Sequence, residues 1–341
     1  MHDLRTALSK AGFAGFSSEK HAARIVIRGI TDPLNAARCC ARVFGVASAA
    51  PGILVPSTIE HVTRSIVQLA EENLRPGQSF AIRARRSAPS SLSRCQIETH
   101  GGSEVLKALN GRSIKVNLKE PDTTIFVDLA GDRAYVYAVR LPGPSGLPLS
   151  SQWRLLAVLD SGPLTILASY AMMRRGCLVE LLIPLSDIFA LFARDYQLSL
   201  ARRLRLSVTR ANYRAYALDV NGLIQEKIER LSLGYGEIRQ LVRVAGAKFA
   251  EQKRYKGLVS SQVSGQSLEF PFVTGDASVN LPIFHPLIGL DIEELIEMCG
   301  LLGIPEEELF SQLNRELSEN KTKVPLTSID LSEMKTERVL L

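Results

Sequence analysis

The sequence predicts a multidomain protein of the α/β and α+β classes, with a doubly wound parallel sheet in its C-terminal half. A Pro- and Gly-rich stretch from Leu141 to Leu149 marks a domain boundary. After it, an apolar run of strand length at residues 153–159 is followed by a short turn, a helix over 164–175 and a second apolar strand over 177–183. This order is a βαβ unit, whose first turn lies where doubly wound folds bind nucleotides. Before the boundary, short alternating strands such as residues 80–84 indicate an α+β region.

The N-terminal segment predicts a small lobe of its own. Residues 1–20 carry few signals, and we expect them to be partly disordered. Residues 24–28 predict a strand, and Asp32 followed by Pro33 predicts the start of a helix, because Asp caps a helix and Pro suits its first position. A second strand is predicted over 47–55.

The next segment holds a concentration of arginines. An amphipathic helix is predicted from Ser57 to the residue before Arg75, and it leads into the strand at 80–84. A basic loop then carries Arg83, Arg85, Arg86 and Arg94. Cations grouped just past the end of a strand can bind a phosphate backbone. A basic loop that only faces solvent is the alternative, and the two interpretations have equal weight. The remaining elements predicted here are a helix over 103–109, strands over 113–118 and 124–129, and a hairpin into a strand over 134–139.

The C-terminal half continues the parallel-sheet pattern. Predicted elements are helices over 186–203 and 235–253, strands over 204–209 and 257–261, and a helix over 292–299 capped by Asp291. Beyond residue 310 we expect only a charged helix and a tail.

The composition excludes some classes of function but does not identify one. Lys plus Arg exceeds Asp plus Glu by 41 to 35, a mild excess compatible with a polyanionic partner. The five cysteines are odd in number and form no CxxC pair, so neither a disulfide framework nor a zinc site is indicated. The sequence has no apolar run long enough to span a bilayer and its start lacks a signal-peptide core, so we expect a cytoplasmic protein.

Four segments in order carry a resemblance to a known family. They are Phe80 to Arg86, Val116 to Asp122, Tyr135 to Tyr137, and Gly143 to Pro148. This run resembles a THUMP domain, the RNA-binding module of several tRNA-modifying enzymes, and the order of elements is similar to that of the tRNA 4-thiouridine synthetases. The resemblance implies a ferredoxin-like lobe over 1–56, a THUMP domain over 57–145, a Rossmann-like domain over 146–310, and a C-terminal helix and tail over 311–341.

The turn after the strand at 153–159 departs from the family pattern. In the synthetases this turn is an ATP-pyrophosphatase loop of pattern S-G-G-x-D-S, and the match places Asp160, Ser161, Gly162, Pro163, Leu164 and Thr165 on its six positions. Gly162 is retained, and Thr165 is a hydroxyl substitute. Asp160 sets a carboxylate where phosphate charge belongs, Pro163 removes an N–H donor, and Leu164 replaces the acid. We therefore expect binding of ATP and Mg, the family's cofactors, to be weak or absent.

Other family segments are also altered. Ser264, Gly265 and Gln266 resemble the family's GQ-containing loop, and His285 replaces an arginine in a segment that supports nucleotide and RNA contacts. A structural role for the His285 segment is weighed above a ligand role. Cys177, at a strand start beside the loop, is the one candidate thiol for sulfur transfer, with a buried structural thiol favoured over it.

Three functions stay open at this point. The first is ATP-dependent adenylation of a tRNA uridine followed by sulfur transfer, which would require a sulfur-donor protein. The second, which the residues favour, is a tRNA-binding protein that has lost its nucleotide chemistry. The third is a scaffold that binds no RNA. A homodimer is left open, catalytic residues stay unassigned, and no metal site is expected.

Overall fold

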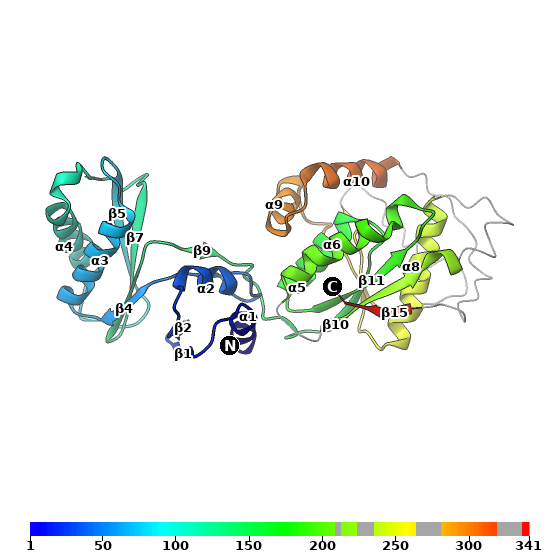
Figure 1. The fold of residues 1–341 in the computed structure, drawn as a ribbon, viewed down its shortest axis with the longest axis horizontal. Helices are drawn as coiled ribbons and strands as arrows, with labels where there is room; N and C mark the ends of the chain where they lie inside the picture. Colours follow the sequence, from blue (N-terminus) through cyan, green and yellow to red (C-terminus); the bar gives the residue numbers. More distant parts are fainter. Residues whose placement is uncertain (209–212, 224–234, 264–280, 319–335, 341) are drawn as a thin grey trace. The chain divides into compact units, whose positions relative to one another are not determined.

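The chain folds into two compact units, Met1–Pro144 and Ser145–Leu341 (Figure 1). A computed structural model describes residues 1–208, 213–223, 235–263, 281–318 and 336–340. Each unit has a hydrophobic core of its own.

A small lobe opens the first unit. Its elements are α1 (His2–Lys10), β1 (Ser17–His21), β2 (Arg24–Arg28), α2 (Pro33–Cys40) and β3 (Ser48–Ala49). Asp32 caps α2 by accepting from the Asn35 N–H, as predicted, and Pro33 is its first residue. The prediction of partial disorder over 1–20 is wrong, because Leu4 and Leu8, one turn apart on α1, are buried in the core of this lobe.

A five-stranded sheet with two helices forms the rest of this unit. Its elements are β4 (Ile53–Pro56), α3 (Ile59–Asn73), β5 (Ser79–Arg86), α4 (Arg94–Ala108), β6 (Lys115–Val116), β7 (Thr123–Ala130) and β8 (Arg133–Tyr137), in sheet order β4-β8-β7-β5-β6. The strand predicted over 47–55 is divided, since β3 pairs with β9 (Leu141–Pro142) while β4 joins the larger sheet beside β8. Helix α4 starts nine residues earlier than predicted, because Ser93 and Gln96 form a capping box in front of it.

The second unit is built on a six-stranded sheet of order β14-β13-β10-β11-β12-β15. The strands are β10 (Arg154–Val158), β11 (Leu178–Leu185), β12 (Ala215–Asp219), β13 (Leu258–Val259), β14 (Ile283–Phe284) and β15 (Thr336–Val339). The first five are parallel, and β15 is an antiparallel edge strand. The chain runs outward from β10 in one direction and then returns to its other side at β13, so a topological switch point lies between β10 and β13.

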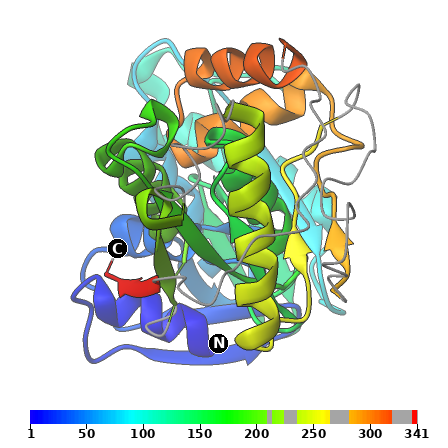
Figure 2. The same cartoon turned by 90° about the vertical axis from the view of Figure 1, so that its right-hand side faces the viewer.

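Helices cover both faces of this sheet. They are α5 (Pro163–Arg174), α6 (Arg194–Leu206), α8 (Tyr235–Gln252), α9 (Ile292–Leu302) and α10 (Glu306–Ser318). Figure 2 shows α8 lying along one face, where its apolar residues pack against Leu156, Val158 and Leu182. The cap of α9 at Asp291 is as predicted. Of the helices described, none combines the length and the apolar character that a membrane crossing needs.

Three predictions for this unit are wrong. Residues 204–206 are the end of α6, and the third strand is β12, eleven residues later than predicted. The helix expected from residue 186 begins at Arg194, after a single 3₁₀ turn at Ala190–Phe192. The expected tail contains β15, which pairs with β12.

Candidate nucleotide and RNA sites

The altered loop lies at the carboxyl end of β10, at the switch point of the parallel sheet. Val158 ends the strand, and α5 begins at Pro163 with Gly162 as its N-cap residue. Gly162 has φ +50°, a conformation that suits glycine, and an added Cβ would lie 3.2 Å from the Tyr196 hydroxyl oxygen. The strand–turn–helix context of the family loop is therefore preserved.

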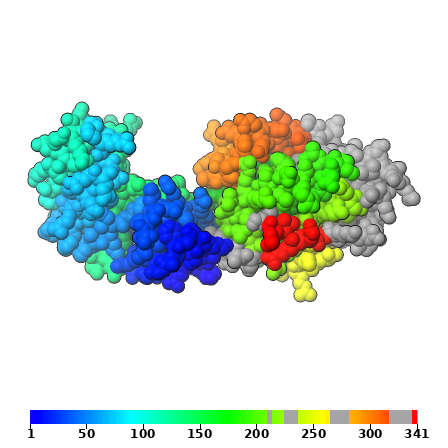
Figure 3. Space-filling view, in the orientation of Figure 1, coloured from blue at the N-terminus to red at the C-terminus, as the bar shows by residue number. Residues whose placement is uncertain are grey.

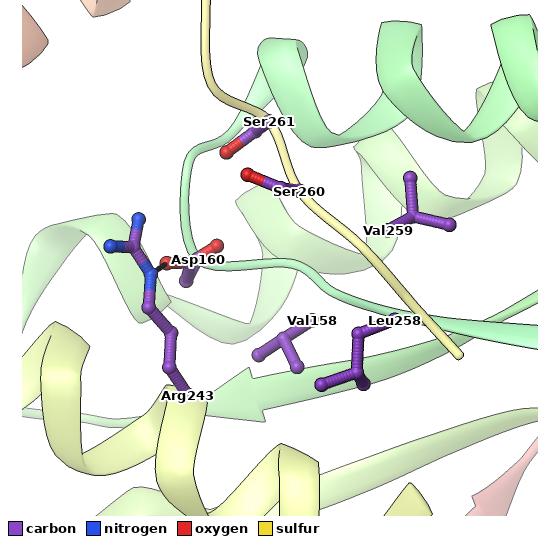
Figure 4. A pocket seen from close by; sticks show the side chains of 7 residues that line it. All are labelled: Val158, Asp160, Arg243, Leu258, Val259, Ser260 and Ser261. Carbon is purple, nitrogen blue, oxygen red and sulfur yellow. Dashed lines mark hydrogen bonds and ion pairs between the residues drawn. The ribbon is translucent and has the colours of Figure 1, made fainter. Parts of the chain in front are cut away.

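The Asp160 carboxylate is held by two arginines of α8. Asp160 is 4% exposed, and its Oδ2 accepts from Nε of Arg243 (Figure 4). Nε of Arg239 lies 3.7 Å from the same oxygen. Arg239 also donates from Nη2 to the Ser161 hydroxyl at 2.5 Å. The Asp160 carboxylate thus lies just before the N-terminus of α5, where the helix dipole favours a negative charge, and two guanidinium groups pair with it.

The backbone of the loop makes its hydrogen bonds internally. The Ser161 N–H donates to the Thr165 hydroxyl at 3.3 Å, and the N–H groups of Leu164 and Thr165 donate to the carbonyls of Ser161 and Gly162. Pro163 has no N–H to give. The hydroxyl expected at Thr165 is present, but it satisfies a loop donor and is buried.

The space beside the loop is small. A cavity of about 20 Å³ is lined by Val158, Asp160 and Arg243 together with residues 258–261 of β13 and the segment after it (Figure 4). That volume suits one water molecule. The Asp160 carboxylate, the engaged N–H groups of Ser161, Leu164 and Thr165, and the missing donor at Pro163 make the described part of the loop a poor fit for the triphosphate of ATP. Leu164, buried at 0% exposure, offers Mg no oxygen ligand.

The other predicted nucleotide residues divide into three groups. Ser264, Gly265 and Gln266 lie outside the described residues. His285 follows β14 at the same edge of the sheet as the loop but two strands from β10, and burial lowers the pKa of its ring. Cys177 is buried, and burial raises the pKa of its thiol.

The predicted position of Cys177 beside the loop is wrong. β10 and β11 are parallel, with Arg154 opposite Leu178, so Cys177 lies at the start of the sheet while Asp160 lies past its end. At about 3.3 Å per residue the two edges are roughly 20 Å apart. Parallel pairing therefore separates this thiol from the nucleotide loop.

The predicted basic loop of the first unit is mostly a strand. Arg83, Arg85 and Arg86 belong to β5, and Arg94 is the first residue of α4, all four being exposed. Alternation along β5 turns Ile82 and Ala84 into the core under the helices, so Arg83 and Arg85 lie on the opposite, open face. The strand continues through the arginines because its backbone pairs with β7 as far as Leu129.

Two of these arginines already have protein partners. Arg83 donates from Nη2 to the Leu118 carbonyl, whereas Arg85 forms a two-pronged contact with the carboxylate of Asp128. Asp128 is buried and also pairs with Nη2 of Arg24 at 2.7 Å. Burial alone would raise the pKa of Asp128, but the Arg85 hydrogen bond and the charges of Arg24 and Arg85 outweigh it and lower that pKa.

The face of the sheet that carries no helix also makes the contacts between the sheet and the lobe. Besides the Arg24–Asp128 pair, the β1–β2 hairpin contributes Glu19, which pairs with Arg133 at 2.8 Å, and His21, whose Nδ1 lies 2.5 Å from the Tyr135 hydroxyl. Sequence reasoning missed Arg24 and Arg133, which add to the cationic character of this face. The only signal was the basic ends of the strand at 24–28.

Sequence reasoning also missed Arg239 and Arg243. They are four residues apart, so they project from one side of α8 toward the loop. An i,i+4 arginine pair in the first half of a helix was a usable signal, but nothing local linked it to Asp160.

The two units define a class of protein: a THUMP-type α+β domain followed by a doubly wound domain of the pyrophosphatase-loop type. Comparison with protein families agrees, since residues 56–139 match the THUMP domain and residues 150–338 match the model described as Thiamine biosynthesis protein (ThiI). The chain belongs to the ThiI family, and the expected resemblance to tRNA 4-thiouridine synthetases is confirmed.

Curated relatives carry the names of tRNA sulfurtransferases. The probable tRNA sulfurtransferase of Aeropyrum pernix is 30% identical over 88% of this chain and 76% of its own length. That of Methanosarcina acetivorans is 28% identical over 80% of this chain and 68% of its own length.

Solved structures show the same fold. A 4-thiouridine synthetase in complex with RNA and ATP superposes with a TM-score of 0.68 at 17% identity, covering 99% of this chain and 94% of that one. A protein of Pyrococcus horikoshii superposes with a TM-score of 0.66 at 22% identity, covering 89% of this chain and 93% of that one.

Proposed function

We propose that this member of the tRNA sulfurtransferase family binds tRNA through its first unit and is impaired in ATP-dependent uridine adenylation. The observation that carries the proposal is the Asp160 carboxylate fixed between Arg243 and Arg239 at the N-terminus of α5. A nucleotide phosphate would have to displace this buried carboxylate from both guanidinium groups. Because Pro163 lacks an N–H and the Thr165 hydroxyl already accepts from the Ser161 N–H, few loop donors would then bind the phosphate.

The tRNA half of the proposal is supported by the THUMP match and by the arginines on the open sheet face. Arg85 keeps one terminal nitrogen, Nη1, beyond its two contacts with Asp128, and its side chain is 57% exposed. A guanidinium held on one edge and open on the other loses little freedom when it binds a phosphate. Arg86, the next residue of β5, and Arg94, the first residue of α4, are also exposed, and alternation along the strand turns Arg86 toward the helical side of the sheet.

Filter binding to total tRNA over a range of salt concentrations tests this half. Arg85→Ala combined with Arg86→Ala should weaken binding by about 2 kcal/mol at low salt, since charge-assisted hydrogen bonds contribute roughly 1.5–3 kcal/mol each before screening. The slope of log K against log salt should fall by about 0.7–0.9 for each phosphate that the variant no longer binds. Arg64→Ala with Arg75→Ala, exposed arginines on the helical side of the same unit, is the matched control. Equal curves for the double variant and the wild type would reject RNA binding by these arginines and favour the scaffold.

Calorimetric titration with Mg-ATP tests the nucleotide half. We expect no binding in the low micromolar range by the wild type. Asp160→Ser combined with Leu164→Asp restores two positions of the family loop and should improve binding. A low micromolar dissociation constant for the wild type would instead favour an active sulfurtransferase that makes 4-thiouridine. A sulfur-donor protein would then be required, and the homodimer and the cytoplasmic location also stay predictions.

A further inference from the structure

The edge of the parallel sheet opposite the loop gathers one aromatic side chain and two basic turns. β10, β11 and β13 are adjacent and parallel, so the residues that precede them lie at one edge. Trp153 precedes β10, the turn 174–177 precedes β11, and the turn 253–257 precedes β13. Backbone hydrogen bonds fix this arrangement, because the Leu178 N–H donates to the Trp153 carbonyl and the Lys256 N–H to the Arg154 carbonyl, both at 3.0 Å.

Trp153 is exposed between these turns. It is the single tryptophan of the chain and is 55% exposed, with its ring 6.1 Å from that of Phe284. A tryptophan normally contributes to a core by burying a large apolar area, and here more than half of it faces solvent. More than half of this large aromatic residue is therefore accessible at this edge.

The two turns are cationic and contain no acid. Their exposed cations are Arg174, Arg175, Lys253, Arg254 and Lys256. Two acids lie close by in the sequence: Glu251 is exposed on the last turn of α8, and Glu180 is buried, paired with Arg154 at 2.8 Å and accepting from the Tyr255 hydroxyl. Figure 3 shows the turn after α8 (yellow) projecting from the surface. Cations at the ends of α5 and α8 also favour the helix dipoles, but that effect gives no reason for an exposed tryptophan between them.

Arg254 adds a further observation. It lies in the left-handed region at φ +57°, where a chain leaving a helix usually has glycine. The sequence thus keeps a charged side chain at a position that its backbone disfavours.

We infer that this edge is a second nucleic-acid contact, at which Trp153 stacks on an unpaired base and the two basic turns bind the neighbouring phosphates. Stacking on an exposed aromatic ring beside cations is how proteins bind single strands with little sequence preference. The inference goes beyond the binding of tRNA by the first unit and does not depend on it.

The single tryptophan makes the test direct. An octauridylate RNA is titrated into the full chain while tryptophan emission reports on this edge and the anisotropy of a labelled RNA reports on total binding. We expect saturable quenching that weakens with salt. Lys253→Ala with Lys256→Ala should lower the salt slope by about 1.4, at about 0.7 per single-strand contact. In a chain that also carries Arg85→Ala with Arg86→Ala, which weakens binding by the first unit, Trp153→Ala should weaken binding at least fivefold by anisotropy, and Trp153→Phe should restore part of it.

Two variants separate binding from folding. Arg254→Gly removes a cation and relieves the left-handed strain, so it should weaken quenching without lowering the melting temperature. Arg194→Ala with Arg202→Ala on α6, exposed cations of the same unit, should leave quenching unchanged. Binding seen by anisotropy without quenching, no binding at all, or equal quenching by polyglutamate would each overturn the inference. The first of these results would leave binding by the first unit intact.

Discussion

Replacing Asp160 by asparagine should destabilise the second unit and convert its loop into an anion site. The change keeps the shape of the side chain and removes its charge. Arg239 and Arg243, whose side chains are 3% and 22% exposed, would then lose the carboxylate that both of them contact. Removing one partner of a buried pair costs about 3–5 kcal/mol, and the partial exposure of Arg243 places the expected cost near the lower end.

The expected shift can be measured by calorimetry. For a domain of this size each kcal/mol corresponds to about 2–4 °C, so a loss of about 3 kcal/mol lowers the melting temperature by roughly 6–12 °C. The scan should be run in chloride and then with inorganic pyrophosphate. A ligand at a hundred times its dissociation constant restores about 2.7 kcal/mol, so pyrophosphate should recover much of the loss in the variant and little in the wild type.

The control is Asp187→Asn, which removes an exposed carboxylate from the same unit. It should change the melting temperature by less than about 2 °C. The counter-ion role is refuted if Asp160→Asn is as stable as the control, or if pyrophosphate stabilises the wild type and the variant equally. Either outcome would mean that Asp160 does not balance the two guanidinium groups in the loop.

Three further predictions concern other residues. Asp128→Asn should destabilise the first unit at neutral pH by less than the about 3–5 kcal/mol of a fully buried pair, because it removes the charge that Arg24 and Arg85 share while their side chains are 21% and 57% exposed, and urea unfolding measures this. The folded-state pKa of Asp128 is lowered from 3.8, so its contribution is present above about pH 4 and is lost as pH falls through the folded pKa; urea midpoints that decline equally below pH 4 in wild type and variant would contradict this. In thiol titration with a disulfide reagent, exposed Cys95 should react fast and buried Cys177 only on unfolding, and fast labelling of Cys177 would make it a candidate reactive thiol again.

Local signals predicted the elements whose ends are fixed by neighbouring residues. The caps at Asp32 and Asp291 act within three residues, and the structure has both. The strand at residues 204–209 failed because the alternation of Leu204 and Leu206 also fits the last turn of a helix, where Leu200 and Leu204 share a buried side. The strand at 336–339 could not be predicted, since its four residues become a strand only by pairing with β12.

The candidate sites show the same limit at the level of side chains. Asp160 could be identified as a misplaced charge from the loop pattern alone, yet its partners come 79 and 83 residues later on α8. Arg85 could be identified as a basic residue, but its partner Asp128 lies 43 residues away on the neighbouring strand. The residue type predicts which hydrogen bonds and ion pairs a side chain can form. The fold determines which of them it already forms within the protein.

The charge balance at the loop explains why an intact fold can accompany an altered site. Without Asp160, the positive end of α5 and the guanidinium groups of Arg239 and Arg243 would lose a nearby negative charge at the switch point of the sheet. A nucleotide can supply that anion only while it is bound, whereas Asp160 supplies it permanently. If nucleotide binding is impaired as proposed, Asp160 takes over the charge balance that a bound phosphate would provide, and the packing of α5 and α8 on the sheet does not depend on a ligand.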